Sequence, residues 1–285
     1  MPITTGRILS MKFGVIGYGN LGKAFVKGLL YTGFSANDIV INVRSEKTRN
    51  EIQEELEART QASLPVFHVT GSKKELVEQT DAVVVVVEPK NAAEVLQELG
   101  TYPLKEKVIL SFMAGITRNE IRQMLGEQGE NATVIRVMPN IAIANGNGVL
   151  GITYDETSCE TVQETICTLE KLGYLLKLEE DGLDYITVTA ASGLAFVAAL
   201  MNSYQKASNT LFQNEIQSKE ITLHIFENML DMMKKETSSF EDIIKRITTK
   251  GGTTEAGLNH LNQEMITETL TDCMQSSYAK CKKIK

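Results

Sequence analysis

Short apolar runs alternate with amphipathic segments along the first part of the chain. The runs predict buried strands at 12–17, 39–43, 66–70, 82–87, 108–113, 133–138 and 174–179. The segments between them, most clearly 21–33 and 160–173, repeat apolar residues at helical spacing. The consecutive valines within 82–87 are β-branched on both faces, which is typical of a strand covered by helices on both sides. We therefore predict an α/β fold with a Rossmann-type, doubly wound parallel sheet.

From about residue 182 the alternation ends, and the apolar repeats have the helical period. Ser238 and Glu241 have the spacing of a capping box at the start of one of these helices. The apolar stripes are wider than so small a helical domain can bury, so we expect a homodimer that shares these helices. Packing of the stripes within one chain is the alternative. We predict an upstream extension at 1–10, a Rossmann domain at 11–181 and an all-helical domain at 182–285.

Composition and charge narrow the classes of function. The chain has 285 residues and a formal net charge of -7, with no long basic block, which argues against a nucleic-acid partner. Its longest apolar run, 82–87, is far shorter than the roughly 20 residues of a membrane span, so we expect a soluble protein without a membrane partner. The four cysteines have no CxxC spacing, so we expect neither a metal site nor a disulfide framework. The cysteine usage fits a reducing cytoplasm.

A glycine motif marks a candidate cofactor site. The sequence "GYGNLG" follows the first predicted strand and opens the first predicted helix, which is the context that a dinucleotide-binding turn requires. Gly17 allows the tight turn, Gly19 lets the backbone approach a pyrophosphate, and Gly22 lets helix and strand pack closely. The helix amides that begin at Asn20 and Leu21 can then hold the phosphates. We therefore predict that residues 11–181 bind a dinucleotide.

The choice between NADP and NAD depends on the end of the second strand. Where an NAD site usually has an acid, this chain has Arg44 and Ser45, which suit a 2′-phosphate, with Lys47 or Arg49 adding charge. Glu46 opposes this interpretation. We predict NADP, with NAD as a possible second cofactor, while the alternative is that these charges only solvate a surface loop.

Further motifs carry a family resemblance. These are "SFMAGI" from residue 111, "RVMPNIAIANGNG" from 136, "LDYITVTAASGLAF" from 183 and "GGTTEAGL" from 251. With "GYGNLG" they make the chain resemble the pyrroline-5-carboxylate reductases along nearly its whole length from Met11. The resemblance implies reduction of the cyclic imine pyrroline-5-carboxylate to proline with NADPH or NADH, in proline synthesis. It also implies a Rossmann domain, a helical dimerisation and substrate domain, and assembly as dimers or rings of dimers.

The resemblance also implies site residues. Backbone amides of Gly252, Thr253 and Thr254 would receive the substrate carboxylate, and the Thr254 hydroxyl would lie by the reacting ring nitrogen as the catalytic group. The physics of a helix start supports the first of these roles, because its unpaired amides and positive dipole end attract an anion. Other positions that align with the family's site are substrate-binding Ser192 and cofactor-binding Val87, Pro89, Ala114, Met138, Pro139 and Asn140. Lys73 stands where the family has an asparagine near the adenosine ribose, and as a cation it would help to bind a 2′-phosphate.

Departures from the family pattern keep a second hypothesis open. Residues 190–194 lack a hydroxyl, a glycine and a proline that the family usually has, Thr249 and Lys250 replace its Ser-Pro, and Glu88 replaces a lysine. The alternative function is therefore an NADP-binding paralogue that has a regulatory role or reduces a different imine. Lys206, on a predicted helix, is a weak candidate for the acid that related dehydrogenases use.

Overall fold

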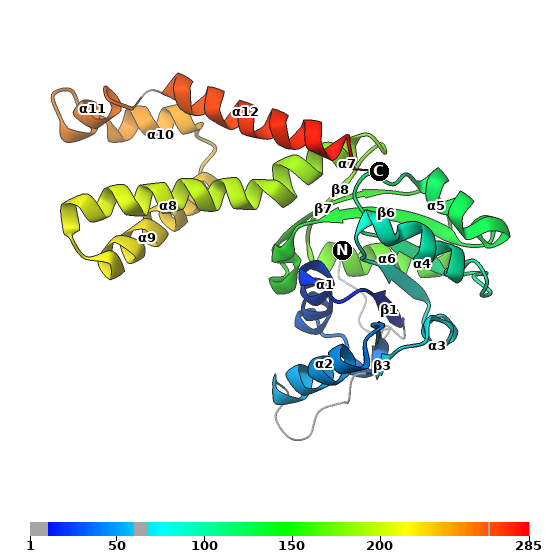
Figure 1. Cartoon of the computed structure of the whole chain (residues 1–285). Helices are drawn as coiled ribbons and strands as arrows, with labels where there is room; N and C mark the ends of the chain where they lie inside the picture. Colours follow the sequence, from blue (N-terminus) through cyan, green and yellow to red (C-terminus); the bar gives the residue numbers. More distant parts are fainter. Residues whose placement is uncertain (1–10, 60–67, 262, 285) are drawn as a thin grey trace, which may run out of the picture. The chain divides into compact units, whose positions relative to one another are not determined.

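The computed structural model describes residues 11–59, 68–261 and 263–284. The extension predicted at 1–10 and the start of the strand predicted at 66–70 lie outside them. The chain forms two compact units: one contains the described residues up to Ser192 together with 278–284, and the other is 193–277 (Figure 1). The domain boundary predicted at residue 181 stays a prediction.

The first unit is built on one eight-stranded sheet of order β3-β2-β1-β4-β5-β6-β7-β8. Its neighbouring strands pair in parallel except β6 and β7, which are antiparallel because the short turn η4 joins them without a crossover helix. The sequence predicted a parallel sheet and did not predict this reversal. The strands are β1 Phe13–Ile16, β2 Ile39–Asn42, β3 His68–Thr70, β4 Ala82–Val85, β5 Val108–Ser111, β6 Thr133–Pro139, β7 Gly148–Thr153 and β8 Gly173–Lys177.

Helices and turns cover this sheet. The α-helices are α1 Asn20–Tyr31, α2 Glu46–Arg59, α3 Lys73–Gln79, α4 Ala92–Leu99, α5 Arg118–Leu125, α6 Glu160–Lys171 and α7 Gly182–Ile186. The shorter 3-10 turns are η1 Ala36–Asp38, η2 Pro89–Asn91, η3 Gly126–Glu130 and η4 Ile141–Asn145, and η5 Thr187–Ser192 is a π-helical turn.

Both faces of the sheet are buried. Val84 belongs to one apolar cluster, with side chains of α1, α2 and α6, whereas Val83 and Val85 belong to a second, with side chains of α3, α4 and α5. All three valines are fully buried. The prediction that helices cover both faces of the valine-rich strand is therefore confirmed.

The second unit is helical and much less buried. Its elements are α8 Gly193–Phe212, α9 Glu215–Lys235, α10 Phe240–Ile247, α11 Thr253–Leu258 and most of α12 Gln263–Cys281. Helices α8 and α9 form a hairpin in which Tyr204 and Phe226 meet edge to face, with ring centroids 5.9 Å apart. The capping box of α10 is Ser239 with Asp242, one residue beyond the predicted pair, because Ser239 is the residue whose extended backbone precedes the helix.

Residues Gly182–Phe212 are one feature that the membrane prediction missed. By length and composition alone this helical stretch could cross a membrane. The mean hydropathy of an 18-residue window within it reaches 1.6, and 17% of that window is buried inside the protein. The longest uninterrupted apolar run, 82–87, does not reveal this helix. A long helix can reach the same hydropathy with polar residues interspersed along it.

Candidate cofactor and substrate sites

The glycine turn between β1 and α1 has the geometry of a phosphate cradle. Gly17 has φ +101°, and a Cβ there would lie 2.5 Å from the carbonyl oxygen of Val86. A Cβ on Gly22 would collide with the carbonyl oxygen of Gly17, so only glycine lets the helix approach the strand this closely. By contrast, a Cβ on Gly19 would meet nothing within 4 Å, which leaves open space above the turn. The three positions fit a bound pyrophosphate in the way the motif requires.

The start of α1 suits an anion. Gly19 is the N-cap and Asn20 and Leu21 begin the helix, whose first turn contains no acidic residue. Among the described residues, no side chain caps these amides. The amides and the positive end of the helix dipole are therefore available to a phosphate.

A cavity of about 280 Å³ lies at the carboxyl ends of β1 and β2, where a doubly wound sheet holds its ligands. Five of the predicted cofactor residues line it: Gly17, Arg44, Ser45, Lys73 and Val87. Six further lining residues were not predicted from the sequence: Ile16, Asn42, Val43, Thr48, Asn91 and Val95. The sequence held part of this information, because Ile16, Asn42 and Val43 lie at the carboxyl ends of predicted strands.

Two carboxylates of α4 pair with the cations of this cavity. Arg44 Nη2 lies 2.8 Å from Glu94 Oε1, and Lys73 Nζ lies 2.6 Å from Glu98 Oε2. Tyr102 Oη donates to the other Glu98 oxygen at 3.1 Å. The hydrogen bond from Lys73 is the main reason that the pKa of Glu98 is lowered, whereas burial, followed by the bond to Glu98, raises the pKa of Tyr102. Nothing in the sequence pattern indicated these two carboxylates.

The other charges after β2 have local roles. Arg49 Nη1 donates to the carbonyl oxygens of Val43 at 3.2 Å and Arg44 at 3.0 Å, so it holds the loop that carries Arg44. Lys47 forms an exposed pair with Glu51 on α2. Ser45 Oγ accepts a long hydrogen bond, 3.4 Å, from the Thr48 amide.

The other predicted cofactor residues lie at the ends of β4, β5 and β6. Pro89 begins η2 after β4, and Ala114 follows β5. The next residue, Gly115, has φ +74°, and a Cβ there would collide with the carbonyl oxygen of Ile284. The end of the chain therefore lies against this loop, which the sequence did not predict. Met138 is buried and Pro139 is the last residue of β6.

Asn140 uses both the oxygen and the nitrogen of its side-chain amide in hydrogen bonds within the protein. Its Oδ1 accepts from the amides of Ala142 at 3.2 Å and Val149 at 3.3 Å, while Nδ2 donates to the carbonyl of Ala190 at 3.3 Å. It thereby ties the end of β6 to η5, the turn that ends at the predicted substrate residue Ser192. These bonds favour a positioning role for Asn140 over direct cofactor contact.

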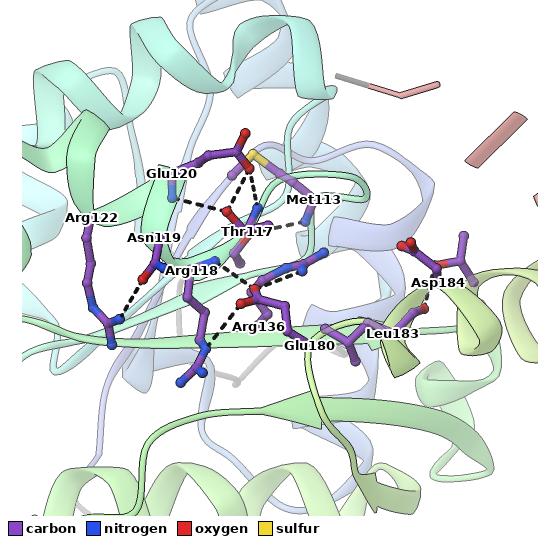
Figure 2. Close-up of polar contacts among 12 residues, drawn as sticks. Met113, Thr117, Arg118, Asn119, Glu120, Arg122, Arg136, Glu180, Leu183 and Asp184 are labelled. Atoms are coloured by element: carbon purple, nitrogen blue, oxygen red, sulfur yellow. Dashed lines mark hydrogen bonds and ion pairs between the residues drawn. The ribbon is translucent and has the colours of Figure 1, made fainter. Parts of the chain in front are cut away.

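Figure 2 shows an ion-pair network that anchors the residues before α7. Arg136 of β6, which is buried, donates from Nη1 to Glu180 Oε1 at 3.0 Å, and the amide of Arg118 donates to the same oxygen at 2.7 Å. Arg118 and Arg122 also bind Asp155, at 2.7 and 2.5 Å. Within the described residues the Nε atoms of Arg118 and Arg136 have no acceptor. Glu180 is thus the carboxylate that balances the buried charge of Arg136.

In the second unit, the predicted carboxylate turn begins α11. Gly252 is the N-cap, and a Cβ on it would lie 2.5 Å from Thr249 Oγ1. Its amide donates to the Thr249 carbonyl at 3.0 Å, and the Gly251 amide donates to Glu255 Oε2 at 2.8 Å. Two of the glycine amides are therefore already used within the turn.

The two threonines keep the donors that a carboxylate needs. Among the described residues, the amides of Thr253 and Thr254 have no hydrogen-bond acceptor, as expected for the first turn of a helix. The predicted anion site is thus reduced to these two amides, with the carboxylate of Glu255 in the same turn. Lys206, the alternative acid, lies exposed on α8.

Comparison with known proteins agrees with both halves of this description. The family model described as NADP oxidoreductase, coenzyme F420-dependent, matches residues 12–115, and the model described as pyrroline-5-carboxylate reductase dimerisation matches 180–284. The pyrroline-5-carboxylate reductase of Aquifex aeolicus is 29% identical over 97% of this chain and 98% of its own length. The predicted resemblance to the pyrroline-5-carboxylate reductase family is therefore confirmed. Pyrroline-5-carboxylate reductase 2 of Bacillus subtilis is likewise 29% identical, over 96% of this chain and 95% of its own.

Solved structures show the same fold. A pyrroline carboxylate reductase of Plasmodium falciparum with NADP bound has a TM-score of 0.81 and 21% identity, covering 96% of this chain and 98% of that chain. A 1-pyrroline-5-carboxylate reductase of Streptococcus pyogenes has a TM-score of 0.81 and 24% identity over the same shares. The predicted fold class, a Rossmann-type sheet followed by a helical domain, and the predicted family are both confirmed.

Proposed function

We propose that this protein reduces the cyclic imine pyrroline-5-carboxylate to proline with NADPH. One observation carries the proposal: the relatives named for this reaction match nearly the whole chain, glycine turn and helical half alike. The three glycines that fit a pyrophosphate and the two cations beside the cavity support the cofactor half of it.

The cofactor would be held by three groups of residues. Gly17, Gly19, Gly22 and the first amides of α1, from Asn20 and Leu21, bind the pyrophosphate. Arg44, Ser45 and Lys73 bind the 2′-phosphate, which makes NADPH the preferred cofactor and NADH the weaker one. Val87, Pro89, Ala114, Met138 and Pro139 lie toward the nicotinamide, and Asn140 positions the turn beside them.

The substrate side needs few groups. The reduced nicotinamide supplies a hydride when bound, and a protonated cyclic imine already accepts one, so no strong side-chain acid is required. We assign the substrate carboxylate to the amides of Thr253 and Thr254 at the N-cap Gly252, and the reacting nitrogen to the Thr254 hydroxyl. Ser192 completes the substrate-binding set.

Assembly and location follow from the same family. We infer a homodimer, alone or in a ring of dimers, in which a second copy covers the exposed apolar residues of 193–277. The match of the dimerisation model to 180–284 supports this. It also offers an explanation other than a membrane for the apolar stretch Gly182–Phe212. A dimer covered in this way would be cytoplasmic, with the helical part from 182 onward serving dimerisation and substrate binding.

The deciding experiment measures NADPH oxidation by the full chain with pyrroline-5-carboxylate. Steady oxidation that depends on the imine and yields proline supports the proposal. Tight NADPH binding without turnover would contradict it and favour the alternative, a paralogue that regulates or that reduces another imine. The altered segments 190–194 and 249–250 are the sequence feature that motivates this alternative.

A further inference from the structure

The cations proposed to hold the 2′-phosphate come from two sides of one cavity. Arg44 follows β2, while Lys73 is the first residue of α3, and both line the cavity that also contains Gly17. Lys73 is nearly buried and sits at the positive end of its helix dipole. A cation in that position requires a nearby anion.

The required anions come from a single face of α4. Glu94 and Glu98 are four residues apart, so their side chains are neighbours on the helix surface, and two like charges at this spacing repel each other. Each carboxylate is balanced by a different cation: Glu94 binds Arg44 at 2.8 Å and Glu98 binds Lys73 at 2.6 Å. Asn91 and Val95 of the same helical segment line the cavity, so the pairs lie at its wall.

The charge count makes this arrangement selective. Two cations and two carboxylates sum to zero, whereas a 2′-phosphate brings about 1.5 to 2 negative charges at neutral pH. Its oxygens must compete with the two carboxylates for the same guanidinium and ammonium donors. A 2′-hydroxyl carries no charge and does not compete. The carboxylates therefore oppose NADPH and leave NADH nearly unaffected.

We propose that Glu94 and Glu98 are specificity-determining residues that, by pairing with Arg44 and Lys73, reduce the preference of this site for NADPH over NADH. The inference rests on the proposed function, because it needs a nucleotide in this cavity. Glu94 is the adjustable member, since both partners of its pair are more than half exposed (61% and 63%). Glu98 is the more structural member, because it also accepts from Tyr102 and its partner Lys73 is 9% exposed.

The test compares 2′,5′-ADP with 5′-AMP, two probes that differ only in the 2′-phosphate, by calorimetry on the full chain. We expect Glu94→Gln to tighten binding of 2′,5′-ADP about 3- to 10-fold, the effect of releasing one exposed ion pair and removing one repulsive charge. Binding of 5′-AMP should stay unchanged. Glu170→Gln is the control with the same charge change, on α6 across the sheet, and should alter neither affinity.

The Arg44→Ala chain tests whether Glu94 acts through its pair with Arg44. In an Arg44→Ala chain the cation for which Glu94 competes is gone, so Glu94→Gln should give little further gain. An equal gain in this background, or no gain in the natural one, would overturn the inference.

The inference and the proposed function fail differently. If the unaltered chain binds neither NADPH nor 2′,5′-ADP, both are wrong. If it binds NADPH and oxidises it with the imine but Glu94→Gln binds 2′,5′-ADP no tighter, only the inference about the two carboxylates is wrong.

Discussion

The two units treat their apolar side chains in opposite ways. Among the described residues, the first unit holds almost every buried apolar side chain, whereas Ile243 is the one that residues 193–277 contribute. The large exposed apolar side chains show the reverse: all but Tyr31, Ile141, Tyr174 and Tyr185 lie in 193–277. A unit that buries its apolar area is stable on its own, while one that exposes it depends on association.

The difference follows from how each unit is built. The sheet of the first unit presents two faces, and each is covered by helices of the same chain. The second unit has no sheet among its described residues, and its hairpin of α8 and α9 leaves an apolar cavity of about 310 Å³. Tyr204, Ile225, Phe226, Met229 and Ile247 are among the side chains that line it.

The largest effect should come from placing a charge on the apolar surface of the second unit. Ile225→Lys removes about 1.5 to 3 kcal/mol of apolar burial per copy, so a two-fold dimer should lose about 3 to 6 kcal/mol of association free energy. Sedimentation velocity would show monomer at concentrations where the parent is dimeric. Tyr174→Lys, an equally drastic change at an exposed site of the first unit, is the control. A dimer that survives Ile225→Lys would contradict the proposed interface.

A core substitution in the first unit should lower the free energy of unfolding by the same amount in the monomer and in the dimer. Phe25 is fully buried and meets Phe13 and Phe112 edge to face, so Phe25→Ala should cost about 3 to 5 kcal/mol of unfolding free energy. The loss should be the same at every protein concentration. For Phe212→Ala, half-exposed in the second unit, the loss should vanish once dilution has separated the dimer. Identical concentration dependence for both variants would remove the contrast between the units.

The ion-pair network of the first unit gives the next effect. Glu180→Gln leaves the guanidinium of Arg136 buried without its carboxylate, at a cost of about 2 to 4 kcal/mol in unfolding free energy. Asp155→Asn is the matched control. Asp155 also binds two arginines, but its side chain is 63% exposed, so its loss should cost about 1 kcal/mol or less. Chemical denaturation of the three proteins measures the difference, and equal losses would show that burial of Arg136 is irrelevant.

How much the sequence could predict depends on how local each feature is. Seven of the eight strands and the glycine turn were predictable, because buried strands leave apolar runs in the sequence and a positive φ requires Gly17, whereas β7 was not among the predicted strands. Contacts between residues that lie far apart in the sequence were not predictable. Glu94 and Glu98 meet Arg44 and Lys73 only because α4 packs beside the end of β2, and no periodicity records that packing.

The end of the chain gives the same lesson. Ala114 was predicted to bind the cofactor, but the contact of its neighbour Gly115 with Ile284 joins residues far apart in the sequence, and no local pattern predicts it. The stripes on the helices after 182 did predict exposed apolar area. The stripes did not predict which of their side chains remain exposed, because that depends on how α8 and α9 pack together.

A smaller effect tests whether the second unit contributes chemistry as well as association. Thr254→Val keeps the shape and the backbone amide but removes the hydroxyl, which should cost about 1 to 3 kcal/mol in transition-state stabilisation, or roughly 5- to 100-fold in kcat/KM. Affinity for NADPH and dimerisation should not change. Thr271→Val, at an exposed threonine of α12 outside the proposed site, is the control and should retain the parent rate. A parent rate for Thr254→Val would exclude a catalytic role for that hydroxyl.

The smallest effect is a pH dependence in the first unit. Because Lys73, mainly through its hydrogen bond, lowers the pKa of Glu98 in the folded protein, the pair contributes stability above the ordinary carboxyl pKa. That contribution is lost as the pH falls through the lowered value, where Glu98 becomes protonated. Glu98→Gln cannot titrate, so the parent should be more stable by up to about 1 kcal/mol near neutral pH, after allowance for solvent screening of a partly exposed pair. The unfolding free energies of the parent and of Glu98→Gln, measured at several pH values, should become equal as the pH is lowered. A difference between them that does not change with pH would mean that the charge of Glu98 does not contribute to stability.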